Sequence, residues 1–366
     1  MGAIGRILLI VVVVVLIAAG AAYFVLPSSA SRTESFTIAR PPASVFARLA
    51  SAPPGTQIAE GVTQTAISSA ADNVVVAEVA YADGATGRAT YTVTPEGAGS
   101  RVDIKLEQAL GSNPLNRVQA LTGGNVGPLA EAAAATVTAD LNAVPAANFA
   151  GLAYSIEQVA ARPFFYVSNC SPQDPEAIKE VVTQSLIVLR PLMARYNLQV
   201  AGDPVAVETS WENEQYCFQI GLPYTGTPPR VLAVGTAGQT PAGVAVRVPY
   251  TGSEEQVIPV YDQMEALIAS ARLVRGKSFE IYHDDATQVG GSINREIFYL
   301  VEGDTAQLTR LAPPAALPTP APAPAAPAAA APAATPAPGT PAPAATPAPA
   351  TPAPATTPTP APATTP

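Results

Sequence analysis

Residues 152–303 contain one order of predicted elements twice, and this repeat constrains the fold more than any other feature of the chain. The first half is predicted to begin with the strand "FFYVSN" (164–169) and to end with the strand "EQYCFQIGL" (214–222). The second half is predicted to begin with "GVAVRVPY" (243–250) and to end with "REIFYLV" (295–301). A helix and a third strand lie inside each half, so we expect an α+β domain made of two βαββ halves.

Both predicted helices of the repeat carry signals at their starts. Asp174 is the expected N-cap of the first helix, because Pro175 follows at the first helical position. Ser253 and Gln256 have the spacing of a capping box for the second helix. Pro259 removes a backbone hydrogen-bond donor, which indicates that the regular part of this second helix starts near residue 258.

Residues 32–145 show a different order of elements. "ESFTIA" (34–39) is predicted to be a strand, and "RPPASVFARLA" (40–50) is a helix with prolines at its start. Alternating apolar and polar residues predict antiparallel strands over 63–110, and a long alanine-rich helix is predicted over 113–144. We therefore expect a second α+β domain, N-terminal to the repeat.

The segment "ILLIVVVVVLIAAGAAYFVL" (7–26) is apolar and uncharged over about 20 residues, which is the length of a transmembrane helix. This pattern predicts an N-terminal signal anchor within residues 1–31, with Arg6 on the cytoplasmic side. Cleavage at "PSSAS" (27–31) is the alternative. The expected protein is membrane-anchored through residues 7–26, and the bulk of the chain is extracytoplasmic, in the periplasm or cell envelope.

Residues 312–366 contain no aromatic and no charged residue and consist of Pro, Ala and Thr apart from Leu317 and Gly339. Such a segment lacks the apolar side chains that build a core, so a disordered Pro/Ala/Thr-rich tail is predicted. As extended polyproline II at about 3.1 Å per residue, the tail would reach on the order of 170 Å. A spacer that contacts the cell wall or envelope and a solubilising tail are both compatible with this composition.

Charge and composition argue against several functions. The formal net charge is −9 and no block of Lys or Arg occurs, so no nucleic-acid partner is expected. The chain has one histidine and no nucleotide-binding or metal-binding motif, so neither a cofactor nor a metal is predicted. Cys170 and Cys217 match no metal-ligand spacing; they form either a disulfide, which suits an oxidising compartment, or two buried free thiols.

The stretch "FTIARPPASVFARLA" (36–50) resembles the opening of the SRPBCC superfamily, which includes START-like and polyketide-cyclase-like domains. "NPLNRV" and "GGNVGPLAEAAAATVTADLNA" are similar to the closing helix of that family. The resemblance implies that residues 32–145 form a helix-grip fold, in which a sheet curls around a long helix and encloses an apolar cavity. The segment "SAPPGTQIAE" (51–60) replaces a tryptophan-containing segment that is usual in the family.

The doubled βαββ pattern, with "GKSFEIYHDD" (276–285) followed by "NREIFYLV" (294–301), resembles the GyrI-like domain, also called the AraC-type effector-binding domain. The resemblance covers residues 152–303. It implies a groove between the two halves that binds small, often cationic or amphipathic molecules among aromatic side chains and a glutamate. Glu296 stands at the position of that glutamate, and Tyr216 stands at the corresponding position of the first half.

Alternation along the last strand places Glu296 and Phe298 on one face. A carboxylate among apolar residues is costly unless a cation neutralises it, and aromatic rings add to the binding of a cation. A pair with Arg295 or Arg247 is the structural alternative for Glu296. The predicted ligand-binding residues are Glu296, Tyr282, Phe298, Tyr216, Trp211 and Tyr166.

The lone His283 is followed by Asp284 and Asp285, and no nucleophile motif accompanies it. Neighbouring residues of a strand point to opposite faces, which is poor geometry for a metal site. We expect this stretch to end a strand and begin a loop, and no catalytic residue is predicted.

These features together predict a small-molecule-binding protein. Its expected ligand is hydrophobic or amphipathic, and a cationic ligand is one of the options. One alternative is a hydrolase or cyclase that uses Glu296 as general base, with a pKa raised by an apolar site. Another is an envelope scaffold that displays the Pro-rich tail.

Overall fold

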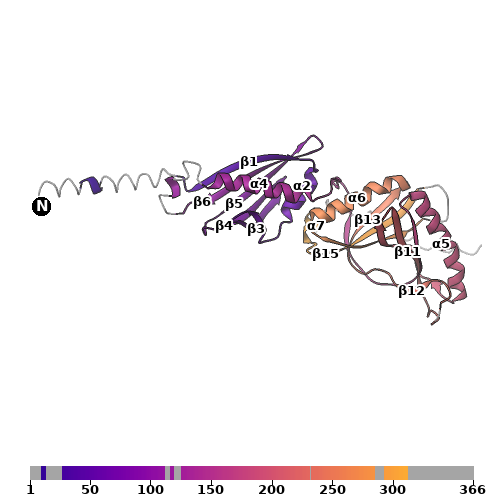
Figure 1. Ribbon diagram of the computed structural model, residues 1–366. Helices are drawn as coiled ribbons and strands as arrows, with labels where there is room; N and C mark the ends of the chain where they lie inside the picture. Colours follow the sequence, from indigo (N-terminus) through magenta and orange to yellow (C-terminus); the bar gives the residue numbers. More distant parts are fainter. Residues whose placement is uncertain are drawn as a thin grey trace, which may run out of the picture. The chain divides into compact units, whose positions relative to one another are not determined.

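The computed structural model describes residues 10–13, 27–111, 116–118, 125–230, 232–284 and 292–311. Two antiparallel sheets and five helices with assigned bounds make up these described residues (Figure 1). The described residues of both sheets belong to one compact unit. The predicted tail over 312–366 lies outside the described residues, and the domain boundaries inferred from the sequence stay predictions.

The first sheet has the strand order β1-β6-β5-β4-β3-β2. Its strands alternate between buried and more exposed residues, most regularly along β4, so one face is buried against helices. The order of strand, short helix, antiparallel strands and long helix is the order that the sequence predicts. The strands are β1 (Ser29–Ile38), β2 (Gln57–Ala59), β3 (Val62–Ala71), β4 (Val74–Tyr81), β5 (Thr86–Glu96) and β6 (Gly99–Ala109), and the helices are α2 (Pro42–Ala50) and α4 (Val126–Asn142).

Helix α4 packs into the concave side of this first sheet. Its buried residues Ala130 and Ala133 are small, which lets the helix backbone approach the sheet closely. Tyr91, Ile104 and Leu106 of the central strands are at most 2% exposed and belong to the same core. The spacing of these alanines in the sequence therefore indicates that α4 packs closely against the first sheet.

The second sheet has the strand order β12-β8-β11-β10-β14-β15-β13-β7, and β9 pairs with β11. Its strands are β7 (Ser155–Val159), β8 (Pro163–Pro172), β9 (Gln199–Val200), β10 (Val205–Glu212), β11 (Gln215–Thr225), β12 (Thr236–Gln239), β13 (Gly243–Gly252), β14 (Val274–Tyr282) and β15 (Ile293–Glu302). The helices are α5 (Pro175–Arg195), α6 (Glu254–Ser270) and the short α7 (Ala306–Leu311).

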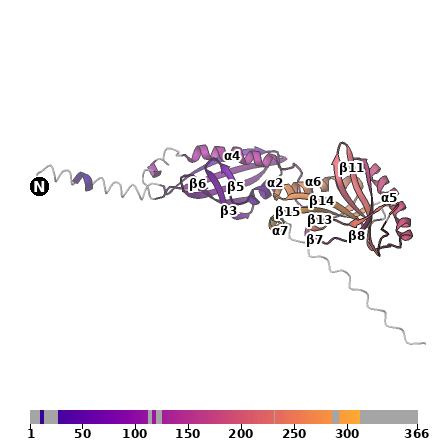
Figure 2. The ribbon, with the colours of Figure 1, turned by 60° about the horizontal axis from the view of Figure 1, so that its bottom comes forward.

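The predicted βαββ order occurs twice in this sheet, as β8-α5-β10-β11 and as β13-α6-β14-β15. The two halves meet where β10 pairs with β14, with Ala206 opposite Glu280. Helix α5 packs on the β8 and β11 side and α6 on the β13 and β15 side of one sheet face, which we call the helix-covered face (Figure 2). The centre of this face, over β10 and β14, is therefore flanked by a helix on each side.

The N-cap residues predicted from the sequence set the starts of both helices of the second sheet, α5 and α6. Asp174 caps α5, and its carboxylate accepts a hydrogen bond of 2.9 Å from the amide of Ala177. Ser253 caps α6, so this helix begins at Glu254, earlier than the sequence analysis expected. Pro259 lies inside the helix, because the cap holds the first turn in place although one backbone bond is lost.

The predicted transmembrane helix over 7–26 and the membrane-anchored, extracytoplasmic location are corrected. No helix in the part of the chain that the structure describes is both long and apolar enough to cross a bilayer. Of the predicted span only residues 10–13, which are helical, belong to that part; the remainder lies outside the described residues. The described residues have an α+β fold with two antiparallel sheets.

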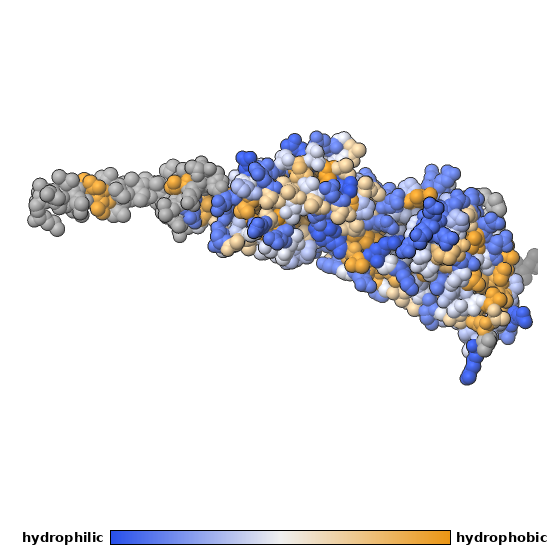
Figure 3. Space-filling view, in the orientation of Figure 1, coloured by the Kyte–Doolittle hydropathy of each residue, from blue (hydrophilic) through white to orange (hydrophobic). Residues whose placement is uncertain are grey.

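Large apolar side chains of the second sheet and its helices are mostly buried. The exposed ones include Ile187 (52%) and Val188 (49%) of α5, Ile258 (48%) of α6 and Val274 (63%) of β14. Figure 3 shows hydrophilic residues over most of the face in view, with a hydrophobic area at the end where α5 lies.

A disulfide joins the two strands β8 and β11 of the second sheet. Cys170 and Cys217 are directly opposite each other in the antiparallel register, and their sulfurs are 2.04 Å apart. The bond closes a loop with a sequence separation of 47 residues that contains helix α5. It therefore restricts the unfolded chain over the segment that contains α5, β9 and β10.

We expect the double variant Cys170→Ser/Cys217→Ser to lose about 4 kcal/mol of unfolding free energy, the loop-entropy value for a loop of this length. Urea unfolding followed by circular dichroism measures the loss. Dithiothreitol should destabilise the wild type and leave the double variant unchanged. A wild type that is equally stable with and without reductant would contradict this expectation.

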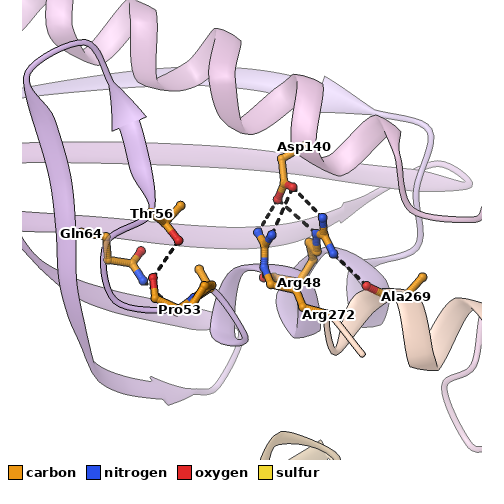
Figure 4. A network of polar contacts seen from close by, with 8 residues as sticks. Arg48, Pro53, Thr56, Gln64, Asp140, Ala269 and Arg272 are labelled. Atoms are coloured by element: carbon orange, nitrogen blue, oxygen red, sulfur yellow. Dashed lines mark hydrogen bonds and ion pairs between the residues drawn. The ribbon is translucent and has the colours of Figure 1, made fainter. Parts of the chain in front are cut away.

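An ion-pair hub joins α4 to the end of α6. The Asp140 carboxylate receives two hydrogen bonds from the Arg48 guanidinium, of 2.7 and 3.1 Å, and two from the Arg272 guanidinium, of 2.5 and 3.3 Å (Figure 4). Arg48 also donates to the carbonyl oxygen of Ala269 at 2.9 Å. The hub therefore ties a helix of the first sheet to the C-terminal end of a helix of the second.

The pKa of Asp140 is lowered, because the two guanidiniums outweigh the opposing effect of burial. A carboxylate with a lowered folded-state pKa stabilises the fold above its unfolded pKa, and this contribution is lost as the pH falls through the folded-state value. Asp140→Asn should cost about 1–2 kcal/mol at pH 7, since the pair is partly exposed. The cost, measured by urea unfolding, should shrink below pH 4, whereas the exposed control Glu131→Gln on the same helix should be near neutral. An equal cost at pH 7 and pH 3 would contradict the assignment.

Candidate functional site

The predicted site residues do not share one face of the second sheet. Tyr282 is directly opposite Arg295 in the β14–β15 register, and Ile281 is opposite Glu296. Because successive residues of a strand point to opposite faces, Tyr282 lies on the helix-covered face and Glu296 on the other. The structure therefore separates the predicted glutamate from the predicted tyrosine.

Glu296 is held in an ion-pair chain. Its carboxylate pairs with the Arg247 guanidinium and lies 3.5 Å from Nε2 of His283. Nδ1 of His283 is 2.8 Å from the Asp203 carboxylate, and Arg247 also donates to Glu157 at 3.0 Å. Glu296 is thus paired with Arg247, one of the two partners that the sequence analysis named for it.

The ionisation of Glu296 follows from these partners. Burial acts to raise the pKa of Glu296, but the hydrogen bond and charge of Arg247, with a smaller effect of His283, bring it below the ordinary value. A general base of the kind considered from the sequence needs a raised pKa. Among the residues that the structure describes, no group of three His, Cys, Asp or Glu side chains is placed to hold a metal ion.

Two further predicted residues lie on the same face as Glu296, inside an aromatic core. Phe298 is 4% exposed and stacks on Phe279 with ring centroids 4.6 Å apart. Tyr166 packs on Phe164 at 5.1 Å. Both contribute to the packing of this second core of the sheet.

Tyr216 lies on the helix-covered face and Trp211 at the edge of it. Tyr216 stacks on Phe218 at 4.8 Å, and its ring is 5.0 Å from the Trp211 ring. Trp211 is 53% exposed near the end of β10. Of the six predicted residues, Tyr216 and Tyr282 therefore face the centre between α5 and α6, with Trp211 beside them.

A partly buried set of acids and tyrosines surrounds Tyr282 and Arg295, which are buried, and we call it the acid–tyrosine cluster. The Tyr261 hydroxyl donates to the Glu280 carboxylate at 2.5 Å. The side chains of Glu280 and Glu254 are only 15% and 16% exposed, and Glu254 is the first residue of α6. The cluster consists of Tyr216, Tyr261, Tyr282, Glu254, Glu280 and Arg295.

Arg295 is at the centre of the acid–tyrosine cluster. Its guanidinium carbon is 4.4 Å from the centroid of the Tyr282 ring, a cation–π contact. The same guanidinium pairs with Glu254 and lies 3.4 Å from the Glu280 carboxylate. A planar cation is thus held between an aromatic face and two carboxylates.

Burial and charge set the protonation of the cluster. Burial raises the pKa of Tyr216, Tyr261 and Tyr282 far above the usual phenol value, so these rings stay neutral hydrogen-bonding groups. Burial also raises the pKa of Glu254, and Arg295 opposes that effect. Two carboxylates face one guanidinium, so the cluster contains one more acidic group than basic groups.

A second guanidinium stands over a second tyrosine farther along the same strand pair. Arg275 of β14 lies 4.7 Å from the Tyr299 ring centroid and donates to Glu208 at 2.9 Å. The hydroxyl of Ser278 also donates to Glu208, at 2.6 Å. The side chain of Arg275 is 36% exposed, against 10% for Arg295, so the acid–tyrosine cluster is the more desolvated of the two.

Sequence reasoning missed Glu254, Tyr261, Glu280 and Arg295. The alternation that placed Glu296 on one face also places Arg295 on the opposite face, together with Tyr282 across the strand pair. Glu280 precedes Tyr282 by two residues and so shares its face. The alternation that groups these residues was present in the sequences of both β14 and β15. The register between the two strands decides which residues of one strand share a face with which residues of the other.

No family model matches the chain, and no curated protein matches it. One solved structure with a likeness to it is EcmrR in a complex with DNA, at 11% identity and a TM-score of 0.35. The match covers 41% of this chain and 57% of EcmrR. A putative transcription regulation protein from Staphylococcus aureus MU50 (15%, TM-score 0.31) covers 42% of this chain and is itself covered in full. SAV2435 bound to tetraphenylphosphonium (12%, TM-score 0.31) covers 41% of this chain, and 94% of it is matched.

These likenesses agree with the GyrI-like part of the predicted resemblance, and none of the comparisons supports the SRPBCC part. At TM-scores below 0.5 they establish neither the fold nor the function of this chain.

Tyr261→Phe should lower the unfolding free energy by about 1–3 kcal/mol, because the buried Glu280 carboxylate loses its hydroxyl donor. Tyr250→Phe is the matched control, since the Tyr250 hydroxyl donates to the Ser253 carbonyl at an exposed position. Urea unfolding of both variants measures the difference. Equal losses of unfolding free energy in the two variants would show that the Tyr261–Glu280 hydrogen bond contributes no more stability than the exposed Tyr250–Ser253 bond.

Proposed function

We propose that the acid–tyrosine cluster binds a small amphipathic organic cation, and that the chain acts as a small-molecule-binding protein. The ligand charge would meet the carboxylates of Glu254 and Glu280. Its apolar part would contact the ring faces of Tyr282 and Tyr216 between α5 and α6. Membrane anchoring is not part of this proposal.

The observation that carries the proposal is the position of the Arg295 guanidinium. A planar, delocalised cation already sits 4.4 Å from the Tyr282 ring, against two carboxylates that are nearly buried. The surroundings of this guanidinium are those that an organic cation requires, namely an aromatic face, opposite charge and little water.

The charge of the cluster favours a cation over an anion. Within the cluster two acidic groups, Glu254 and Glu280, face one basic group, Arg295, and Lys179 outside the cluster also acts on Glu254. An anion placed here would lie against two carboxyl groups in a poorly solvated position, which is costly. A cation would gain from both carboxyl groups.

The test uses the full chain and three probes of similar size, namely tetraphenylphosphonium, neutral triphenylphosphine oxide and anionic tetraphenylborate. We expect tetraphenylphosphonium alone to raise the thermal unfolding temperature. At a hundredfold excess over Kd the stabilisation should be about 2.7 kcal/mol.

Glu280→Gln should weaken tetraphenylphosphonium binding about tenfold or more, because it removes one buried charge, equivalent to about 1.4 kcal/mol. Glu296→Gln is the matched control on the opposite face and should bind like the wild type. Equal stabilisation by all three probes, or equal effects of the two variants, would rule out the acid–tyrosine cluster as a cation site. The absence of any shift would favour the scaffold alternative.

A further inference from the structure

We propose that Arg295 is an internal competitor, a cation of the chain itself that occupies the ligand position and is displaced when an external cation binds. This inference rests on the proposed function and adds its regulation. The affinity for the ligand would then depend on the free energy of exchanging the Arg295 guanidinium for the ligand cation, and not on the filling of an empty pocket.

The first line of support is the place of Arg295 itself. The residue is 8% exposed, and its guanidinium takes the aromatic face of Tyr282 and both carboxylates at once. A ligand cation that used Glu254, Glu280 and Tyr282 would have to occupy the same volume. The two cations therefore exclude each other.

The second line of support is that Arg295 is incompletely satisfied. Its Nε atom is buried and has no hydrogen-bond partner among the described residues. Its contact with Glu280 is 3.4 Å, longer than the 2.7–2.9 Å typical of a charge-assisted bond. A buried donor without a partner costs free energy, and movement of the side chain toward water would recover it.

Displacement requires no change of fold. Arg295 is the third residue of β15, and its flexible side chain changes direction by rotation about its own bonds while the strand keeps its pairing with β13 and β14. Glu254 stands at the first position of α6, where the helix N-terminus also favours its negative charge. The two carboxylates thus remain in place for the incoming cation.

The opposite face supplies a matched control. Arg247 also bridges two carboxylates, those of Glu157 and Glu296. Among the described residues, the guanidinium–ring contacts are those of Arg275 and Arg295. Replacement of Arg247 removes the same kind of ion-pair bridge from the same sheet without touching the acid–tyrosine cluster.

The experiment is isothermal titration of tetraphenylphosphonium into the full chain, as wild type, Arg295→Met, Arg295→Lys and Arg247→Met. We expect Arg295→Met to tighten binding at least tenfold, because its side chain is flexible, ends short of the carboxylates and carries no competing charge. Arg295→Lys should tighten it less, since an ammonium still competes but lacks the planar group that stacks on Tyr282. Arg247→Met should equal the wild type.

The outcomes separate the two proposals. Weaker binding by a folded Arg295→Met than by wild type would show that Arg295 shapes the site, which overturns this inference and leaves the proposed function standing. No binding by wild type or by folded Arg295→Met would overturn both. Binding by Arg295→Met alone would support the competition and overturn the proposal that the wild type takes this ligand unaided.

A measurement on the wild type covers the case in which Arg295→Met fails to fold. The Nε–H proton of Arg295 lies near the Tyr282 ring and should have a ring-shifted NMR resonance, assigned by its loss in Arg295→Lys. Titration with tetraphenylphosphonium should move this resonance toward the position of an exposed arginine. A resonance that keeps its shift while the cation binds would overturn the inference.

Discussion

The register between β14 and β15 decides the chemistry of the second sheet. It places Tyr282 opposite Arg295 and Ile281 opposite Glu296, so two adjacent charged residues are sent to opposite faces. A slip of one residue would exchange them and put Glu296 beside the tyrosine. The candidate site therefore depends on strand pairing over the whole ladder, which extends to the contact of β10 with β14 at the centre of the repeat.

Duplication explains why the site lies where it does. Each βαββ half brings one helix to the same face of the sheet, and the two halves meet at β10 and β14. The centre of the face is then flanked by α5 and α6 and receives side chains from both halves, such as Tyr216 from the first and Tyr261 from the second. Stability there comes from the surrounding cores and the Cys170–Cys217 bond, which leaves the central residues free to be polar.

Local signals predicted the elements well, because caps, turns and alternation act over a few residues. Asp174 and Ser253 cap the helices that they were expected to cap, and both halves of the repeat have the predicted order. The site was harder, because the prediction of Glu296 as its centre used alternation within one strand and lacked the register with the next. The ion pair of Glu296 with Arg247 spans 49 residues. The sequence named Arg247 and Arg295 as alternative partners, and only the pairing of the strands decides between them.

Arg247 and Arg295, on the neighbouring strands β13 and β15, show why two sets of the same charged residue types differ in chemistry. Arg247 and Arg295 each bridge two glutamates, but their side chains are 28% and 10% exposed. Solvent screens the first set, so its charges contribute little beyond holding the strands. The second set is desolvated and includes the face of Tyr282, so each charge interacts strongly and an unpaired donor on Arg295 is costly. Strong attraction combined with incomplete satisfaction is the condition under which one cation can replace another.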